Sequence, residues 1–490
     1  MNDDQRRQVR ENAQYLQSVR PIDPEEIYEY VEGQPHPATV RQVLRESAVD
    51  LGLLERPDGT FVPVEDGPVA VEFDGVERLP ETYARRLEDL LVERYGPGWP
   101  EDESGDRLRE RVREIKERYL RGNPVDYDET TALGYALYHL PAYYAAVQYV
   151  LADLLVDGLL PRDLRVLDVG AGVGGPALGL HDLLYGAPGA SDERGNDDAD
   201  AEPTALVDYH AVEPSAAADV LTDLLSETGS NFHPSIHRTT AEAFDPDGEY
   251  DLLVFANVLS ELDDPEAVLE RYLDALAPEG TLVALAPADR NTAIQLRDIE
   301  RAVADHGPAT VYAPTVRLWP HDSPDGECWS FDVQPDLDVP AFQRRLDDAA
   351  TDQDHEDGEF ENVDVQYAYS LLRLDGRQSI DVSPDRSRVA KMAESESFVT
   401  ERVDLLAVKL SHDLADDGNP LFLVGDGSQQ VDHFAVLTEE SMLNADLRTA
   451  DYGDLLSIEN ALVLWNDDER AYNVVIDGET VVDSVPADRL

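Results

Sequence analysis

The sequence has one cysteine, three lysines and three methionines among its 490 residues. The single thiol, Cys328, excludes internal disulfides, zinc sites built from several thiolates and iron–sulfur clusters held by this chain's own cysteines. No run of about 18 apolar residues is present, so no transmembrane helix is expected. The first residues, MNDDQRRQVR, lack the apolar core of a secretory signal. We therefore expect a cytoplasmic protein.

Basic residues are also scarce, because 103 acidic residues stand against 39 basic ones and give a net charge of −64. The acidic residues are spread along the whole chain rather than gathered in one tail. This pattern is typical of a halophilic protein, since molar salt reduces the Debye length to roughly 3 Å and screens self-repulsion. A specific acidic function is the alternative. The charge does not exclude an RNA partner, because local arginines can face RNA at high salt.

The length predicts roughly two to four domains. Residues 1–78 read as helix, helix and hairpin, which is the order of a winged-helix-like module, with a small structural cap as the alternative. If this module binds nucleic acid, Arg41 and Arg45 on its second helix are the candidate contacts. Residues 79–157 are predicted to be helical, and the run RLRERVREIKERYL is expected to form a solvated face through arginine–glutamate pairs.

Residues 158–375 alternate strand and helix signals, which predicts an α/β fold with a mostly parallel sheet covered on both faces. Two acidic segments, 186–204 and 347–362, are expected to be solvated loops within it. Residues 396–490 switch to strand signals. Three strands, a short helix and two or more further strands indicate a β-rich, OB-like domain. A strand-rich dimerisation module is the alternative there.

The stretch VLDVGAGVGG, residues 166–175, reads as a buried strand that turns directly into a helix. The spacing of Gly170, Gly172 and Gly175 fits the dinucleotide pattern G-x-G-x-x-G. The spacing of Gly170, Gly172 and Gly174, with Asp168 just before it, equally fits a pocket for S-adenosylmethionine. The motif alone leaves both cofactors open.

The next strand, VDYHAVEP, supplies an acid for ribose hydroxyls in Glu213. Glu213 lies 43 residues beyond Gly170, against about 20 in dinucleotide folds, and the acidic insertion accounts for most of the excess. Pro176 favours S-adenosylmethionine, because it removes an amide that a pyrophosphate would use. The segment TTAEAF, with Ala241 and Glu242, stands before the fourth strand, where an adenine would be read.

The fourth strand ends at Ala256-Asn257 and is followed by an amphipathic helix and a Pro-x-Gly turn at 278–280. This order is typical of a Rossmann-like class I methyltransferase, and it favours S-adenosylmethionine. We expect it to be bound by a set of residues from the strand ends: Asp168, Gly170, Gly172, Gly174, Glu213, Ala241, Glu242 and Asn257. Asp168 would hold the methionine amino group, directly or through water.

The sequence defines the residues that would contact the methyl acceptor less clearly than those that would bind the cofactor. Asn257 and Glu261 are the catalytic candidates that can touch an acceptor, although Glu261 equally suits the role of a helix cap. The Asp/Asn-Pro-Pro-aromatic motif of exocyclic amine methylases is replaced here by Asn257-Val258-Leu259-Ser260. Cys328 lies outside any motif of carbon-5 pyrimidine methylases. Methyl transfer needs chiefly alignment of donor and acceptor.

Several stretches resemble one particular family, namely YHLPAYYAAVQYVLADLL, LDVGAGVGG, NVLSEL and LAPADRNTAIQLRDIERAV. Residues 130–375 are similar to the methyltransferase-like family of mitochondrial small ribosomal subunit assembly factors, which has bacterial and archaeal relatives. The resemblance implies S-adenosylmethionine binding and a partner in the small ribosomal subunit or its rRNA. It places the protein in ribosome biogenesis and translation.

Many members of that family carry cysteines after the last Rossmann strands that can hold an iron–sulfur cluster. The matching region here, residues 311–331, keeps only Cys328, with Thr315 at an implied ligand position. One thiolate cannot hold a cluster, so we expect no metal cluster. We expect Trp319, Trp329 and Phe331 to pin this segment instead.

Three functions remain in order of preference. The first is an S-adenosylmethionine-dependent methyltransferase acting on small-subunit rRNA. The second is a non-catalytic assembly factor that binds the same cofactor. The third, suggested by the G-x-G-x-x-G match, is an NAD-dependent oxidoreductase.

Overall fold

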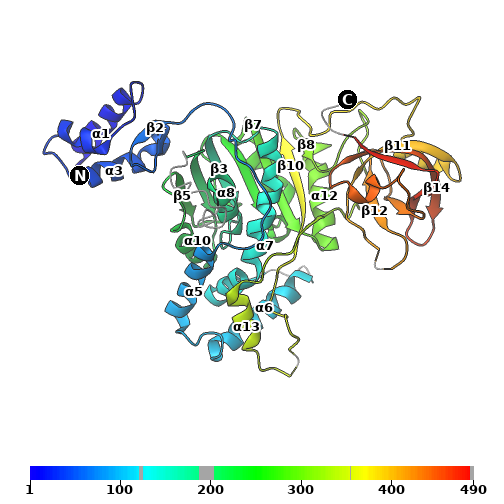
Figure 1. The fold of residues 1–490 in the computed structure, drawn as a ribbon, viewed down its shortest axis with the longest axis horizontal. Coiled ribbons are helices and arrows are strands. Elements are labelled where there is room, and N and C mark those ends of the chain that lie inside the picture. Colours follow the sequence, from blue (N-terminus) through cyan, green and yellow to red (C-terminus); the bar gives the residue numbers. More distant parts are fainter. Residues whose placement is uncertain (121–124, 187–202, 354, 416, 486–490) are drawn as a thin grey trace. The chain divides into compact units, whose positions relative to one another are not determined.

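The structure is a computed structural model that describes residues 1–120, 125–186, 203–353, 355–415 and 417–485 (Figure 1). Nearly all of the acidic segment 186–204 lies outside the described residues, so the expected loop there stays a prediction. Residue contacts divide the chain into two units. One unit contains Met1–Val254 and Pro335–Val365, and the other contains Phe255–Gln334 and Gln366–Leu490.

The first unit begins with a small module of helices and one hairpin. Its first helix is not expected from the sequence, and a capping box between Asn2 and Gln5 starts it. Asp23 caps the second helix, which lasts only one turn and continues as a 3₁₀ turn. The elements are α1 (Asp3–Leu16), α2 (Pro24–Ile27), η1 (Tyr28–Tyr30), α3 (Pro37–Glu46), α4 (Ala48–Leu51), β1 (Leu53–Glu55) and β2 (Phe61–Pro63).

Arg41 and Arg45 lie on α3 as expected, but both guanidinium groups donate to the carboxylate of Glu55. The Glu55 side chain is 2% exposed, and the pairs hold its pKa below the usual range against the opposing effect of burial. The two arginines therefore tie α3 to β1 rather than presenting open cations to a phosphate. The backbone of Glu55 also exchanges hydrogen bonds with the side chain of Asn231.

The helical region consists of α5 (Glu81–Tyr95), α6 (Glu103–Leu120) and α7 (Glu129–Val156). The expectation of a solvated arginine face on α6 is wrong for Arg109, and Arg113 has a distant partner instead of a local one. Arg109 is buried and donates to the carbonyl oxygens of Pro100 and Leu346. Arg113 forms a bidentate pair with Glu359. These contacts fix α6 against residues more than 200 positions later in the chain, which no local pattern reveals.

The acidic segment 347–362 is largely an irregular and partly exposed stretch, as expected of a loop, but two buried residues anchor it. It follows α13 (Ala341–Asp348) and folds back on it. The Asp347 carboxylate accepts hydrogen bonds from the backbone amides of Gly358 and Phe360, both at 2.9 Å. The Phe360 side chain is fully buried, so an apolar anchor within an acidic run decides its structure.

A mixed sheet forms the centre of the chain. Its hydrogen-bonded strand order is β5-β4-β3-β6-β7-β10-β8, with β9 paired to β10 outside this path. The first strands are parallel, whereas β10 is antiparallel to both of its neighbours. The bounds are β3 (Asp163–Val169), β4 (Leu206–Val212), β5 (Phe232–His237), β6 (Tyr250–Ala256), β7 (Leu276–Pro287), β8 (Thr310–Ala313), β9 (Asp332–Gln334) and β10 (Val365–Arg373).

If the short β9 is left out and the strands are numbered in chain order, their order across the sheet is 3-2-1-4-5-7-6. The antiparallel seventh strand between the fifth and sixth defines the class I methyltransferase sheet. It departs from the order 3-2-1-4-5-6 of dinucleotide-binding folds. The predicted Rossmann-like methyltransferase fold is thus confirmed. The Pro-x-Gly segment at 278–280, expected as a turn before the strand, lies within β7.

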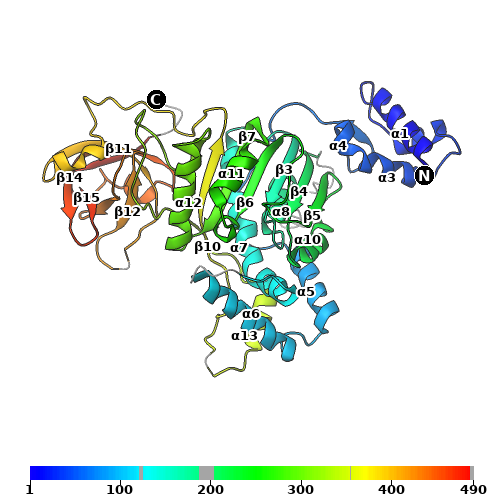
Figure 2. The same ribbon diagram turned by 180° about the vertical axis from the view of Figure 1, so that it is seen from behind.

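Helices pack on the sheet in both units. In the first unit α7 packs against α8 (Gly175–Tyr185) and α10 (Ala217–Leu225), and two glycines of α8 allow the close approach. A Cβ on Gly179 would lie 2.4 Å from a Val147 methyl group of α7. In the second unit α11 (Pro265–Leu273) and α12 (Arg290–Ala304) pack on β7 (Figure 2). No helix among the described residues is long and apolar enough to cross a membrane.

The C-terminal part of the second unit is a small β-barrel. Its strands pair in the closed ring β11-β12-β13-β15-β14-β11, with β13 and β15 parallel and β16 added to β14. A helix stands between the third and fourth strands, as in an OB barrel, and the OB-like expectation is confirmed. The elements are η4 (Met392–Phe398), β11 (Arg402–Lys409), β12 (Leu421–Gly425), β13 (His433–Leu437), α14 (Asp446–Thr449), β14 (Leu455–Asn466), β15 (Ala471–Ile476) and β16 (Val481–Val485).

Candidate cofactor site

The loop after β3 adopts a backbone conformation that favours glycine. Gly170, Gly172 and Gly174 have φ angles of +72°, +56° and +96°, which other residues rarely adopt. A Cβ on Gly174 would in addition lie 2.6 Å from the Leu221 side chain. Gly172 has no such neighbour, because the nearest atom lies 3.9 Å away. The loop therefore turns tightly and leaves free space beside Gly172.

Asp168, the penultimate residue of β3, is almost fully buried. Tyr209 donates its hydroxyl to one carboxylate oxygen, Oδ2, and the other, Oδ1, has no hydrogen-bond partner among the described residues. Burial raises the pKa of Asp168 to about 7, the Tyr209 hydrogen bond opposes this shift, and the Glu213 charge adds to it. An unpaired buried carboxylate oxygen is costly, so it fits a ligand that brings a cationic donor such as an ammonium group.

Glu213 follows the end of β4 and is buried. Its carboxylate accepts hydrogen bonds from the backbone amides of Gly172 at 3.0 Å and Ser215 at 2.9 Å. Each oxygen uses one acceptor position in these contacts and keeps a second one. Glu213 therefore fixes the glycine loop and retains acceptor capacity for the two hydroxyls of a ribose.

Ala241 and Glu242 lie in the turn between β5 and β6, with Ala241 buried and Glu242 exposed. The strands β3, β4 and β5 are parallel, so this turn, Glu213 and the glycine loop all follow carboxyl ends at one edge of the sheet. Ligands of open α/β sheets bind at that edge. The residues predicted to contact the amino group, the ribose and the adenine of the cofactor thus all come from the expected edge of the sheet.

Asn257 directly follows β6 and lies in the second unit. Its φ angle is +60°, its side chain is buried, and its backbone N–H donates to the Leu285 carbonyl oxygen at 2.9 Å. A non-glycine residue held in this conformation is uncommon and is often found at functional sites. A pocket opens beside it, and all of its lining residues are uncharged, including Asn257, Leu259, Ser260, Leu285, Thr292 and Gln295.

Glu261 does not line this pocket. It is exposed at the end of the 3₁₀ turn η3 (Leu259–Glu261). The side-chain cap of α11 is Asp264, which accepts the backbone N–H of Ala267. Of the two predicted catalytic candidates, Asn257 therefore lines the pocket and Glu261 lies on the protein surface.

Tyr209 is a site residue that the sequence reasoning missed. It lies on β4 next to β3, and its hydroxyl holds the Asp168 carboxylate. The available signal was a tyrosine in a buried parallel strand, since a buried tyrosine hydroxyl needs a polar partner. Asp168 was the nearest acid on the neighbouring strand.

The family resemblance associates residues 311–331 with an iron–sulfur cluster. In this chain, hydrogen bonds and a ring contact hold the aromatic side chains of that segment in place. The indole nitrogen of Trp319 donates to Asp426 at 2.6 Å, and that of Trp329 donates to the Ala288 carbonyl at 2.9 Å. Trp329 also contacts Phe331, with ring centroids 5.3 Å apart. Within the described ranges, no three His, Cys, Asp or Glu residues are placed to hold a metal ion.

Comparison with known families assigns three regions. Residues 143–338 match a methyltransferase domain model. Residues 6–57 and 393–485 match the N-terminal and C-terminal domains of a family described as a domain of unknown function, DUF8157. A search of the curated proteins gives no match.

Solved structures similar to this chain include methyltransferases of low sequence identity. The plantazolicin methyltransferase BpumL in complex with SAH is 14% identical, with a TM-score of 0.24 and coverage of 44% of this chain and 66% of its own. A proposed methyltransferase from Thermoplasma acidophilum is 12% identical, with a TM-score of 0.27 and coverages of 44% and 70%. A proposed RNA methyltransferase from Pyrococcus horikoshii is 12% identical, with a TM-score of 0.27 and coverages of 47% and 82%.

The strand order and the family match assign the same cofactor. A class I methyltransferase domain uses S-adenosylmethionine, and the residues present fit it. The unpaired Oδ1 of Asp168 suits its ammonium group, and Glu213 suits its ribose. Residues 143–338 are thus a methyltransferase domain of class I architecture, whose implied cofactor is S-adenosylmethionine.

Proposed function

We propose that this protein methylates RNA, and that its substrate is the RNA of the small ribosomal subunit. The observation that carries methyl transfer is the sheet edge formed by Asp168, the glycine loop and Glu213. Bound S-adenosylmethionine supplies an electrophilic methyl group for in-line displacement. Asp168 anchors the amino group and Glu213 the ribose, and together they align the donor. Asn257 orients the acceptor from the pocket beside β6.

The C-terminal barrel supports an RNA substrate. OB barrels bind oligonucleotides, and aromatic side chains on them stack against bases. The Trp465 side chain at the end of β14 is 39% exposed and lies 4.8 Å from the Tyr472 ring. Another part of the barrel is already covered, because buried side chains of β11 and β12 pack on Val316 and Leu318. We therefore place RNA at Trp465.

The N-terminal module, residues 1–78, is proposed to be winged-helix-like. The helical region 79–157 is proposed to connect it to the methyltransferase domain.

The direct test is transfer of labelled methyl groups to deproteinised small-subunit RNA in strong KCl. The proposal predicts label in the RNA, lost in Asp168→Asn and retained in Met442→Ala, a surface change in the barrel where the side chain is 99% exposed. Absence of label together with measurable cofactor binding would reject methyl transfer to this RNA.

A second function has its own supporting observation. The pocket beside Asn257 is lined by uncharged residues, so no carboxylate or imidazole stands there to accept a proton from an acceptor. A non-catalytic assembly factor that binds S-adenosylmethionine and the small subunit needs no such group. It predicts cofactor binding and co-sedimentation with the subunit, and no growth effect of Asn257→Ala. Methyl transfer predicts a growth or modification defect for the same variant.

A further inference from the structure

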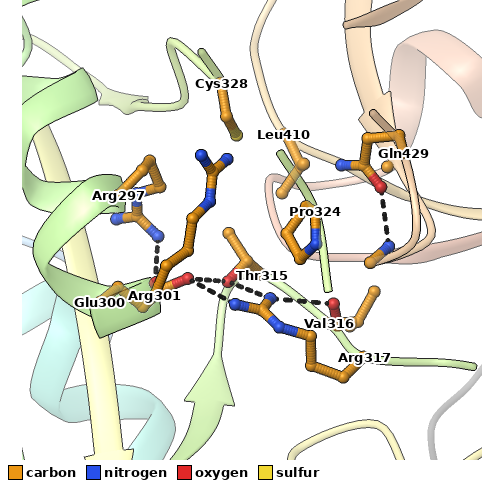
Figure 3. Close-up of a pocket in the computed structure, with 12 residues that line it drawn as sticks. Arg297, Glu300, Arg301, Thr315, Val316, Arg317, Pro324, Cys328, Leu410 and Gln429 are labelled. Atoms are coloured by element: carbon orange, nitrogen blue, oxygen red, sulfur yellow. Dashed lines mark hydrogen bonds and ion pairs between the residues drawn. The ribbon is translucent and has the colours of Figure 1, made fainter. Parts of the chain in front are cut away.

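A second cavity lies within the second unit. It is bounded by α12, the segment 315–328 and the barrel loop 425–429 (Figure 3). Three of its lining residues are arginines and one is an acid. The lining residues with polar side chains are Arg297, Glu300, Arg301, Thr315, Arg317, Cys328 and Gln429.

The one carboxylate in the lining is already saturated. Glu300 accepts hydrogen bonds from Arg297 at 2.6 Å and Ser370 at 2.9 Å, and from the Thr315 hydroxyl. These donors and charges hold its pKa below the usual range despite full burial. Arg317 is occupied as well, because its guanidinium group forms two bonds of 2.7 and 2.9 Å with Asp305. Neither residue needs a further partner.

Other polar residues of the cavity lining still have hydrogen-bond donors available. Arg297 is 1% exposed, and its Nε has no hydrogen-bond partner among the described residues. Arg301 is paired loosely at 3.5 Å with Asp298, whose side chain is 62% exposed. Figure 3 shows the Arg301 guanidinium group extending toward Cys328. Gln429 uses its carbonyl oxygen to accept the Gly427 amide at 2.9 Å, which leaves its NH₂ group as a donor.

Cys328 does not offset this excess of donors. Burial raises the pKa of its thiol to about 11, so the group is a neutral weak donor at neutral pH. The backbone amide of Cys328 donates to Asp432 at 3.2 Å, which gives that carboxylate a partner outside the cavity lining. Apolar side chains of Val316, Pro324 and Leu410 complete the wall. The lining therefore offers these remaining donors no carboxylate that is free to pair with them, and an anion would supply that charge.

The size of the space selects the kind of anion. It has room for about one water-sized species, which favours a small monatomic anion over sulfate, phosphate or a carboxylate. We propose that this cavity binds a single halide ion, chloride in the cell, between Arg297 Nε, Arg301 and Gln429. The ion would join α12 to the barrel loop and compensate the buried positive charge. This site is independent of the cofactor edge and of the proposed methyl transfer.

The test uses the full-length protein and a halide that can be located. Crystals grown in potassium bromide are expected to show anomalous density in this cavity, in contact with Arg301 and Arg297. Chloride-35 NMR in solution is expected to show excess line broadening that bromide displaces. The variant Arg301→Gln is expected to lose both signals, since it removes a charged donor but keeps a polar side chain.

The matched control is Arg290→Gln on the same helix. Arg290 is paired with Glu327 at 2.6 Å, and its side chain is 64% exposed, so its loss removes the same charge outside the cavity lining. The control is expected to retain the bromide density and the line broadening. A cavity that holds only water in bromide crystals overturns the proposal, as does equal line broadening in Arg301→Gln and the unchanged protein.

Discussion

At the scale of single residues, the protonation of Asp168 determines how the cofactor binds. Its pKa of about 7 means that the carboxylate is mostly neutral at pH 6 and half ionised at pH 7. An ammonium group binds the ionised form. We therefore expect S-adenosylmethionine to bind about fivefold more tightly at pH 7 than at pH 6, because the ionised fraction rises by that factor. Calorimetric titration at the two pH values measures this.

Tyr209 provides the matched control for this prediction. Its hydroxyl donates to Asp168 and lowers the pKa of that carboxyl, so Tyr209→Phe is expected to move the affinity change to higher pH. Asp168→Asn is expected to bind weakly at both pH values. An affinity that does not change with pH in the unchanged protein would show that an ionised Asp168 is not part of the binding contact.

The same carboxyl also influences the ligand-free protein. Because its folded-state pKa lies above the ordinary value of 3.8, the folded chain binds more protons than the unfolded one between these values. The stability contributed by Asp168 is then present below pH 4 and is lost as pH rises to about 7. Cofactor binding at neutral pH supplies the missing cationic partner, so added S-adenosylmethionine should raise the unfolding temperature more at pH 7 than at pH 6.

At the scale of elements, the packing of α7 on α8 depends on one glycine. A Cβ at Gly179 would lie 2.4 Å from Val147 and 2.5 Å from the Tyr144 carbonyl oxygen. We expect Gly179→Ala to reduce the free energy of unfolding by about 1–3 kcal/mol, through overpacking. The measurement is denaturant unfolding.

The control for that variant is a second helical glycine. Gly134 of α7 has only ordinary contacts for an added methyl group, the nearest being 3.5 Å away on Arg111. Gly134→Ala is expected to be neutral or to stabilise the protein by up to about 1 kcal/mol, because alanine is the better helix former. Equal destabilisation by both variants would contradict the assigned close contact.

The barrel makes a separate prediction about RNA. Base stacking on an aromatic side chain contributes about 1–3 kcal/mol per base. Trp465→Ala should therefore weaken binding of single-stranded RNA about 5- to 150-fold, whereas Trp465→Phe keeps most of the affinity. Filter binding in strong KCl measures both. Unchanged affinity in Trp465→Ala would remove the barrel from the RNA site.

The elements also show how far sequence reasoning reaches. The glycine loop, the acids at the strand ends and the alternation of strands and helices were predictable, because each follows from a local pattern of apolar residues and turns. The pairing of Arg41 and Arg45 with Glu55, and the burial of Arg109, were not. Both depend on partners that only the tertiary structure brings together. The hydrogen bond from Tyr209 to Asp168 belongs to the same class.

At the scale of the whole molecule, the net charge of −64 dominates the response to salt. Self-repulsion of the folded chain weakens as the Debye length falls from about 10 Å at 0.1 M to 3 Å at 1 M. We expect the unfolding temperature to rise steeply with KCl up to about 1 M and more slowly above it. Arg301→Gln should retain this rise, because screening does not require the halide site. A protein equally stable at 0.1 M and 1 M KCl would contradict the halophilic interpretation.

The central claim is that the edge formed by Asp168, the glycine loop and Glu213 binds S-adenosylmethionine rather than a dinucleotide. Its most direct test is calorimetric titration of the full-length protein with S-adenosylmethionine and with NAD, in strong KCl at pH 7. We predict saturable binding of S-adenosylmethionine at one site per chain, weakened at least tenfold in Glu213→Ala, and no binding of NAD. Binding of NAD, or of neither compound, would contradict the account.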